Sequence, residues 1–508
     1  MSWALYTILA VPRAATLASL LPDWRLARAV TVIAGLFALG VAIAIAIRVS
    51  HGRVFDTAAG WLRVDSLGAV FLLATAFVYA MAAVFSVGYI GVERSGAGFG
   101  WFARRYFSLL NLFGAVMLLV PLASDFGVLW VAVELTTIVS ALLVAIDRTD
   151  GALEAAWKYV LIASSGLGIA LLAVIVIYAT GTQALGSAYI PRFTRLIAHA
   201  HTLSPDAVKL AFVLAVVGFG TKVGFVPMHT WLPDAHSEAP APASAMLSGS
   251  LLAAALYAIL RFFQVAVANG DRGFAQHVLI VFGAISLIAA SFFVLRQGNF
   301  KRLLAYSSIE HMGIIALGIG FGVPLAVAGA LLHVITHAST KALAFLGTGS
   351  LLRGYGTKEV EHVRDAGRRM PWTGPMFMAG TLALCGLPLS GVFRSEFEIV
   401  TGGFQAAQYI GVTLLVVFVN VAFFGVIWHS SSMVIGRDPA AASAHPGGGP
   451  AGALPVAGGP LAARERSAWM VAGMLGCLVV VVGLGVHLPG DLVALLDSAR
   501  HRLEVPGA

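Results

Sequence analysis

Two ionisable side chains lie in the middle of apolar stretches in the first half of the chain. Lys222 is part of GFGTKVGFVPMHTWLPDAH, which follows the apolar run VKLAFVLAVV, and Glu134 is part of LWVAVELTTIVSALLVAI. A charged side chain at the centre of an apolar span costs about 3 kcal/mol, so both residues are expected to have a partner and a function. We predict that they form an ion pair, and that breaking and remaking this pair lets the lysine carry protons near neutral pH. A static structural salt bridge is the alternative.

A second group of titratable residues follows in LLHVITHASTKALAFLGTG. His333, His337 and Lys341 recur at intervals of four residues and therefore share one face of a helix. Histidine can pass a proton between its two ring nitrogens, so a proton relay is the leading interpretation. Metal binding would need a third ligand, and haem ligation would need histidines on facing helices. Hydrogen-bonded core histidines are the remaining alternative.

Two further charges lie within apolar segments. Lys158, in AAWKYVLIASSG, is near the start of its predicted span, where it could join a relay or extend its ammonium to the membrane interface. Glu396, in GLPLSGVFRSEFEIV, follows a proline break. We include Glu396 among the candidates for proton transfer, and both interpretations of Lys158 stay open.

The elements that must position these residues are transmembrane helices. Of the 508 residues, 59% are hydrophobic and only 11% are charged, and the mean hydropathy is +0.89. A soluble domain has about a quarter charged residues, so the composition predicts an all-α polytopic membrane protein. The net charge of +8 comes from arginines in short loops, where they set membrane topology, and does not indicate nucleic-acid binding.

The cysteine content limits the cofactors that the chain could hold. Cys385 and Cys477 are the two cysteines, each in an apolar segment and neither in a C-x-x-C pair. Isolated thiols cannot hold an iron–sulfur cluster or a four-ligand zinc site. We therefore expect no cofactor in this chain.

Apolar stretches recur from one end of the chain to the other. We predict fourteen membrane spans, near residues 2–21, 27–48, 65–90, 104–122, 125–146, 155–179, 207–229, 243–265, 275–296, 303–322, 325–351, 371–391 continuing past 396, 406–432 and 468–488. Lys and Arg are more numerous in the loops that follow odd-numbered spans. The positive-inside rule then places both termini outside the cytoplasm.

Two predicted spans contain helix breaks in corresponding positions. Pro227 follows Lys222 in the seventh span, and Pro388 precedes Glu396 in the twelfth. Paired interruptions are typical of inverted repeats around a transport path, so we predict two inverted five-helix repeats, spans 4–8 and spans 9–13. The predicted organisation is helices 1–3 in 1–100, the first repeat in 101–268, the second repeat in 269–432, a flexible Gly/Pro/Ala-rich loop in 433–466, and the last helix with its tail in 467–508.

Several of these motifs resemble one known superfamily. VAVELTTIVSALLVA and GFGTKVGFVPMHTWLPDAHSEAPAPASA resemble the proton-translocating antiporter-like subunits of respiratory complex I, of multi-subunit sodium/proton antiporters and of energy-converting hydrogenases. KRLLAYSSIEHMGIIALGIGFG, HASTKALAFLGTGSLL and GLPLSGVFRSEFEIV extend the likeness over most of residues 65–430. Within the superfamily, SSIEHMGIIALGIGFG and FRSEF look most like the F-type membrane subunit of hydrogenase-4.

The resemblance implies proton-transfer roles for individual residues. By motif, Glu134 and Lys222 match the glutamate–lysine pair of the first half. In the second half, His333, His337 and Lys341 match the histidine–lysine helix of the superfamily. Glu396 matches the charged position on the broken twelfth helix. Lys301 matches a basic residue at the membrane interface, where the tenth helix begins.

The chain departs from the superfamily pattern on the eighth helix. Relatives commonly carry Lys or His there as the link between two half-channels, whereas this helix, ASAMLSGSLLAAALYAILRFF, offers Ser248 and Ala253. Either water completes the relay or this subunit conducts less directly than its relatives.

The resemblance implies a proton-translocating membrane subunit of an oxidoreductase complex. Its expected partners are other membrane subunits and a hydrogenase-type or complex I-like redox arm, and its expected location is the cell inner membrane. The subunit itself is not expected to hold a catalytic centre. The alternatives are a sodium/proton antiporter subunit or a proton-driven partner in inorganic-carbon uptake, and a non-pumping structural anchor descended from a pump.

Overall fold

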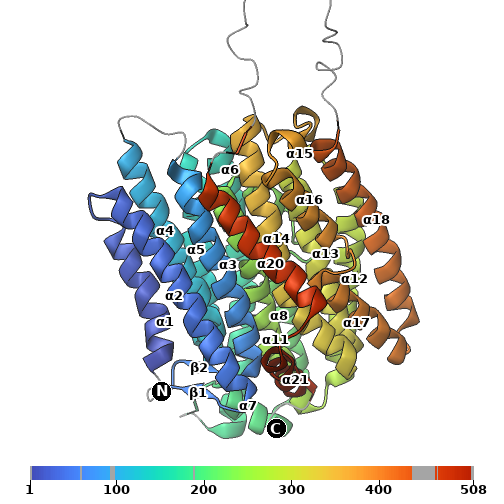
Figure 1. The fold of residues 1–508 in the computed structure, drawn as a ribbon. Helices are drawn as coiled ribbons and strands as arrows, with labels where there is room; N and C mark the ends of the chain where they lie inside the picture. The colour runs from blue at the N-terminus through green and yellow to red at the C-terminus, as the bar shows by residue number, and fades with distance from the viewer. Residues whose placement is uncertain are drawn as a thin grey trace, which may run out of the picture.

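The protein is a bundle of long helices that run side by side (Figure 1). The computed structural model describes residues 3–57, 60–91, 98–186, 189–436, 464–465 and 467–504. The helices of the first half are α1 (Trp3–Ala18), α2 (Trp24–Ser50), α3 (Ser66–Gly91), α4 (Phe99–Leu119), α5 (Phe126–Val144), α6 (Asp150–Leu185), α7 (Phe193–Ala198), α8 (Pro205–Val223), α9 (Trp231–Glu238), α10 (Ala241–Met246) and α11 (Leu252–Asn269).

The second half continues the bundle. Its helices are α12 (Arg272–Val294), α13 (Phe300–Phe321), α14 (Pro324–Tyr355), α15 (Ala366–Arg369), α16 (Thr373–Leu384), α17 (Gly391–Gln405), α18 (Tyr409–Val434), α20 (Ala468–Val486) and α21 (Gly490–Glu504). A π-helical turn at Leu247–Leu251 joins α10 to α11. Short 3-10 turns lie at Val120–Leu122, Ala145–Asp147, Ala200–Thr202 and Val360–His362. Outside the helices, β1 (Phe55–Asp56) and β2 (Arg63–Val64) form one short antiparallel pair.

The structure confirms an all-helical membrane protein. Among the described residues, ten helical segments are long and apolar enough to cross a membrane. The four other predicted positions contain helices that differ from a simple apolar span. They are α1, which is short, α8 and α14, which carry buried lysines, and the interrupted pair α16–α17. The loop predicted over 433–466 lies outside the described residues except at its edges.

Both predicted break regions are non-helical. α8 ends just before Gly224, whose φ of 88° is left-handed, and Pro227 lies in the stretch before α9. α16 and α17 are separated by a stretch that contains Gly386, at a φ of 67°, and Pro388. Backbone groups freed at such breaks must be satisfied by protein or water, so polar groups are expected to gather there.

The core of the bundle surrounds α13 and α14. The membrane-crossing part of α13 is completely buried. α14 packs against α3, α13, α16, α17 and α20, so it has neighbours on every side. A helix enclosed in this way can carry polar side chains that never meet lipid.

The longest helix that was not predicted is α21. No helix was expected after residue 488, yet α21 lies at the end of the bundle at which α1 begins (Figure 1). Its buried residues are Leu495, Leu496 and Ala499 together with Leu503, a helical spacing. The other face is polar, so the helix is too mixed in character to be read as a span.

A buried ion pair joins the residue before α3 to α11. The Arg261 guanidinium donates from Nη1 to Asp65 Oδ2 at 2.8 Å and from Nη2 to Asp65 Oδ1 at 2.7 Å. Asp65 Oδ1 also accepts from the Gly68 amide in the first turn of α3. Burial alone would raise the pKa of the Asp65 carboxyl, but Arg261 outweighs burial and holds this pKa well below its usual range.

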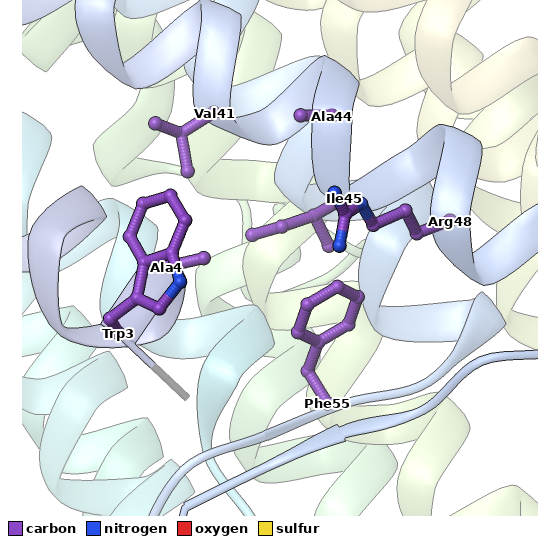
Figure 2. Close-up of a pocket in the computed structure, with 7 residues that line it drawn as sticks. All are labelled: Trp3, Ala4, Val41, Ala44, Ile45, Arg48 and Phe55. Atoms are coloured by element: carbon purple, nitrogen blue, oxygen red, sulfur yellow. The ribbon is translucent and has the colours of Figure 1, made fainter. Parts of the chain in front are cut away.

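An apolar cavity of about 80 Å³ lies between α1, α2 and β1 (Figure 2). It is lined by Trp3, Ala4, Val41, Ala44, Ile45, Arg48 and Phe55. None of the residues predicted to transfer protons lines it, so the candidate site lies elsewhere in the bundle.

Candidate functional site

Lys222 is held by neutral groups at the interrupted end of α8. Its side chain is buried, with 1% of the residue exposed. Its Nζ donates to the main-chain oxygen of Val133 at 3.1 Å and to the hydroxyl of Thr137, both on α5. The ring of Tyr159, on α6, has its centroid 5.8 Å from Nζ. These partners hold an ammonium without supplying a compensating negative charge.

Glu134, the predicted partner of Lys222, lies on α5 next to Val133. Its Oε1 accepts a hydrogen bond from Ser164 at 3.0 Å, whereas Oε2 has no hydrogen-bond partner. The described residues show no direct ion pair between Glu134 and Lys222, although the carboxylate acts electrostatically on the ammonium. The two residues are therefore neighbours on packed helices, with Lys222 bonded to neutral oxygens.

Lys158 lies at the rim of a charged cavity. Its Nζ contacts Glu154 at 2.6 Å and Asp234 at 3.5 Å, and its side chain is about half exposed. These three residues, with Arg302 and Glu238 among others, line a cavity of about 410 Å³. In the described part of the chain, no hydrogen bond or ion pair links Lys158 to Lys222.

Lys301 lies at the start of α13 and is enclosed by protein. Its expected place at the membrane interface stays a prediction, and the residue is 1% exposed. Its Nζ donates to the main-chain oxygens of Ser237 and Ala239, at the C-terminal end of α9. A helix C-terminus presents carbonyl oxygens without intrahelical partners, and a buried ammonium satisfies them.

Lys341 is the counterpart of Lys222 in the second half. It is fully buried on α14, and its Nζ donates to the main-chain oxygen of Leu304, on α13, at 3.0 Å. That same oxygen accepts from the hydroxyl of Ser308 at 3.0 Å. The Ser308 hydroxyl lies 2.7 Å from that of Ser248, at the π-helical turn before α11. The residue on the eighth predicted helix thus reaches Lys341 through one serine and one carbonyl.

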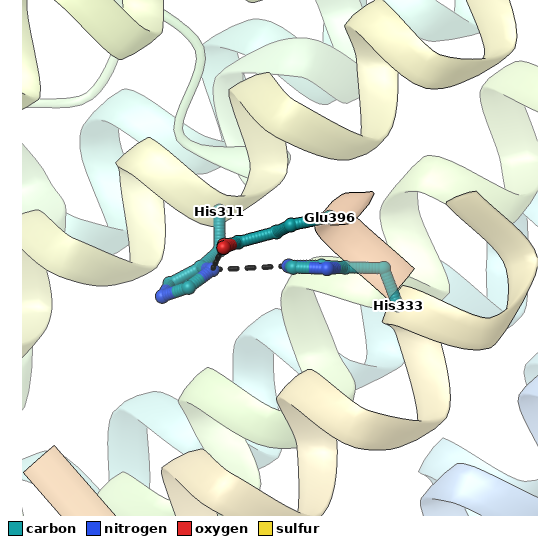
Figure 3. Close-up of side chains that lie close together, drawn as sticks. All are labelled: His311, His333 and Glu396. Carbon is teal, nitrogen blue, oxygen red and sulfur yellow. Dashed lines mark hydrogen bonds and ion pairs between the residues drawn. The ribbon is translucent and has the colours of Figure 1, made fainter. Parts of the chain in front are cut away.

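Four residues from three helices form a histidine–carboxylate cluster: His311, His333, His337 and Glu396. His311 Nδ1, on α13, lies 3.0 Å from His333 Nε2, on α14, and 3.9 Å from Glu396 Oε1, on α17 (Figure 3). The ring centroid of His337 is 5.2 Å from that of His311. The structure therefore brings together three of the predicted residues and one that was not predicted.

Glu396 connects this cluster to a cavity at the second helix break. The cavity has a volume of about 250 Å³, and its lining includes Glu396, Cys385, Gly386 and Asn420. The lining residues come from α17, from α18 and from the stretch that follows α16. The cluster thus has a route by which a small ion could approach its carboxylate.

Sequence reasoning missed three buried residues: His236, Glu310 and His311. His236, on α9, is fully buried and stacked on Phe345, and neither ring nitrogen has a hydrogen-bond partner. Glu310 is buried on α13 and interacts electrostatically with Lys341. Both α13 residues lie in the middle of the apolar stretch 303–322, so the criterion that selected Glu134 would also have selected them.

The buried groups follow one another from one half of the bundle to the other. Lys222 precedes the break, and His236, after the break, interacts electrostatically with both Lys301 and Lys341. Glu310 acts in turn on Lys341 and on Glu396. A membrane interior with this many titratable side chains is typical of an ion or proton pathway.

The fold and these buried groups define an antiporter-like membrane subunit. Residues 123–422 match the family model described as NADH:quinone oxidoreductase/Mrp antiporter, transmembrane region. The chain belongs to this family.

Curated relatives come from several kinds of complex. The chain is 36% identical over 367 residues to a hydrogenase-4 component F homolog of Methylacidiphilum infernorum, covering 71% of this chain and 76% of the relative. It is 31% identical over 355 residues to hydrogenase-4 component B of Escherichia coli, covering 68% and 51%. It is 32% identical over 324 residues to NAD(P)H-quinone oxidoreductase chain 4 of Prochlorococcus marinus, covering 64% and 59%. The chain thus spans about half to three-fifths of the length of the last two relatives.

Solved structures share the whole fold. A chain of the archaeal membrane-bound sulfane sulfur reductase superimposes with a TM-score of 0.84 at 23% identity, covering 99% of this chain and 98% of the other. A chain of the Mrp complex of a Dietzia species gives a TM-score of 0.85 at 22% identity, covering 100% and 98%. Both likenesses concern the fold.

Proposed function

We propose that this chain is a proton-translocating membrane subunit of a hydrogenase-type or complex I-like oxidoreductase complex. The observation that carries the proposal is Lys222, an ammonium buried between α5, α6 and α8 and held by neutral partners. Redox centres would reside in a partner arm, and other membrane subunits would flank this chain. The 36% identity to a hydrogenase-4 component F homolog supports the choice of a hydrogenase-type complex.

The mechanism follows from how Lys222 is bound. Val133 and Thr137 supply neutral oxygens to the ammonium of Lys222. When Lys222 gives up its proton, no hydrogen-bonded carboxylate therefore loses its counter-charge. Movement of Glu134 toward or away from the ammonium would favour the charged or the neutral form of Lys222. A distant redox event acting on Glu134 would thereby drive uptake and release of a proton by Lys222.

The second half would carry the proton onward. Lys341 sits between the Ser248–Ser308 hydroxyl pair and Glu310, and the histidine–carboxylate cluster follows on α13, α14 and α17. The hydroxyl pair can transfer a proton because each serine both donates and accepts. In this proposal, serines take the place of the Lys or His that relatives carry on the eighth helix.

The proposal includes an arrangement in the membrane. We propose fourteen spans, counting α1, α8, α14 and α16–α17 with the ten apolar segments, arranged as two inverted five-helix repeats. The described chain ends lie at one end of the bundle, which supports an even number of crossings. We place that end outside the cytoplasm of the cell inner membrane, which reporter fusions at either terminus would test.

Replacing Lys222 tests the function directly. Lys222→Met keeps the volume of the side chain but removes the proton carrier, so we expect proton translocation into vesicles to be lost while the subunit still assembles. Lys209→Met is the matched control, because Lys209 lies on the same helix α8 but is half-buried and pairs with Asp271 at 3.2 Å. Translocation by Lys222→Met at the wild-type rate would refute the proposal.

The alternative is a sodium/proton antiporter subunit, or a partner in inorganic-carbon uptake, without a redox arm. It draws on the shared fold with a chain of an Mrp complex. Vesicles that exchange sodium for protons in the absence of any electron donor would favour it. Copurification with nickel–iron or iron–sulfur proteins would favour the redox complex, and a subunit inactive in both assays would be a structural anchor.

A further inference from the structure

We propose that His311, His333 and Glu396 form a binding site for a divalent transition-metal ion of the zinc class. Metal binding by His333 and His337 needs a third ligand, which the H-x-x-x-H pattern alone does not supply. The structure supplies further ligands from neighbouring helices instead. Such a site goes beyond proton translocation, since it would give the subunit a way to respond to a metal ion.

The geometry is close to that of a metal site. One ligand atom from each of the three residues lies within 4.8 Å of the other two, and the closest pair, His311 Nδ1 and His333 Nε2, is 3.0 Å apart (Figure 3). Zinc binds nitrogen and carboxylate oxygen at about 2.0–2.1 Å, so two ligands of a tetrahedral ion lie about 3.3 Å apart. The observed distances lie on both sides of this value, and small side-chain rotations would bring the three atoms around one ion.

Hydrogen bonds already fix one ligand in the form that a metal needs. The Ser395 hydroxyl donates to the main-chain oxygen of Val392 at 2.8 Å, so its oxygen accepts from His333 Nδ1 at 2.9 Å. His333 therefore carries its proton on Nδ1 and points the lone pair of Nε2 toward His311. A ligand histidine that donates its other ring N–H to a neighbouring group is the usual arrangement in metal sites.

Unpartnered polar atoms point to a missing ligand. Glu396 is 8% exposed, and its Oε1, the atom that faces His311, has no hydrogen-bond partner. Both ring nitrogens of the buried His337 also lack a partner. Leaving a buried polar atom without a partner is destabilising, and a bound ion would remove this cost for Glu396. His337 is the candidate for the fourth ligand.

The local charges favour a divalent ion of this class. Glu310 and Glu396 interact electrostatically, and Lys341 acts on Glu310. Two carboxylates against one ammonium leave a charge that a divalent cation would offset. Two imidazoles with one carboxylate suit zinc, cobalt or copper, whereas magnesium and calcium prefer oxygen ligands.

The ion also has a way in. The cavity of about 250 Å³ at the second helix break has Glu396 in its wall, with Asn420 and Cys385 beside it. Glu396 is the member of the three-residue group that lines this cavity, so its carboxylate is the ligand accessible from it. Cys385 is not part of the three-residue ligand group.

Cobalt(II) provides a direct test on the full chain purified in detergent. We expect wild type to bind one ion with the intense visible absorption of a tetrahedral site, and zinc to displace it. His333→Asn and Glu396→Gln should each weaken zinc binding at least tenfold, and Ser395→Ala, which removes the hydrogen-bonded support of His333, about tenfold. Thermal unfolding of each variant reports whether it is folded.

Two controls separate this site from adventitious binding. His236→Asn removes another buried, unpartnered histidine outside the cluster, and Cys385→Ser removes the thiol in the cavity wall; neither should change zinc affinity. Zinc affinity unchanged in folded His333→Asn or Ser395→Ala would overturn the site. A weakly absorbing six-coordinate cobalt complex would overturn it as well.

The consequence for transport rests on the proposed function. An ion on these histidines would occupy lone pairs that a proton pathway needs, so zinc should slow proton translocation by wild type, with Ser395→Ala requiring about ten times more zinc. If the same zinc concentration slowed proton translocation by wild type and by Ser395→Ala, the link between the metal site and transport would be overturned. Vesicles that move no protons at all would refute the proposed function and leave the cobalt result to decide the metal site.

Discussion

At the scale of single residues, the two halves of the molecule treat their central lysine in the same way. Lys222 donates to the main-chain oxygen of Val133, and Lys341 donates to that of Leu304. Each oxygen belongs to a neighbouring helix, and neither ammonium is in a direct ion pair within the described chain. A neutral acceptor does not require its donor to stay charged, so both lysines can give up a proton without leaving a hydrogen-bonded carboxylate unpaired.

Glu310 is the residue whose role can be tested most cleanly. It is buried beside Lys341, so Glu310→Gln removes a charge while keeping the shape of the side chain. We expect proton translocation in vesicles to fall at least about tenfold, because an altered interaction of about 1.4 kcal/mol is enough for that change. Glu361→Gln, on the exposed turn after α14, should leave the rate unchanged. Equal rates in the two variants would show that Glu310 has no part in the pathway.

The sequence is sufficient to find titratable residues that lie inside apolar runs. This criterion predicts Lys222 and Lys341, and applied to the apolar stretch 303–322 it would also find Glu310 and His311. The burial of Lys301 could not be predicted, because it depends on the end of α9 lying beside the start of α13.

At the scale of helices, the elements are fixed by two different kinds of contact. Long apolar runs and prolines were enough to predict an all-helical membrane protein and the two breaks. The position of α3 against α11 depends instead on Asp65 and Arg261, 196 residues apart in sequence. A pair so far apart in sequence leaves no local pattern. The amphipathic α21 was missed for a related reason, because its apolar face is buried only where the helix packs on the end of the bundle.

The ion pair between Asp65 and Arg261 predicts a large effect on stability. Asp65→Asn leaves the Arg261 guanidinium buried without its counter-charge, so we expect a loss of about 3–5 kcal/mol, seen as a lower melting temperature in detergent. Asp56→Asn is the matched control, since its partner Arg63 lies 2.9 Å away at the surface, and it should cost at most about 1 kcal/mol.

The same ion pair predicts a pH dependence. The pKa of the Asp65 carboxyl is depressed in the folded protein, so its stabilisation is fully present above the unfolded value of about 4 and is lost as the pH falls below it. The difference in melting temperature between wild type and Asp65→Asn should therefore be constant from about pH 7 to pH 5 and shrink in stronger acid. A difference that vanished already at pH 6 would contradict the assignment.

At the scale of the whole molecule, one face of the bundle is unsuited to lipid. Val131, Leu135 and Ile138 are exposed on α5, and Glu134, between them, is partly exposed as well. Apolar side chains are stable against lipid, but a carboxylate in the middle of a span is not. We therefore expect another membrane subunit to cover this face of α5, where it could act directly on Glu134.

Photo-crosslinking in the native membrane would test this arrangement. A photoreactive amino acid in place of Ile138, which is 52% exposed on α5, should form an adduct with a second membrane protein, identified by mass spectrometry. The same amino acid in place of Ile33, which is 64% exposed on α2, is the control for lipid-facing positions and should react mainly with lipid. Lipid adducts alone at Ile138 would mean that Glu134 borders the bilayer. Lys222 would then have to change its protonation without help from a neighbouring subunit.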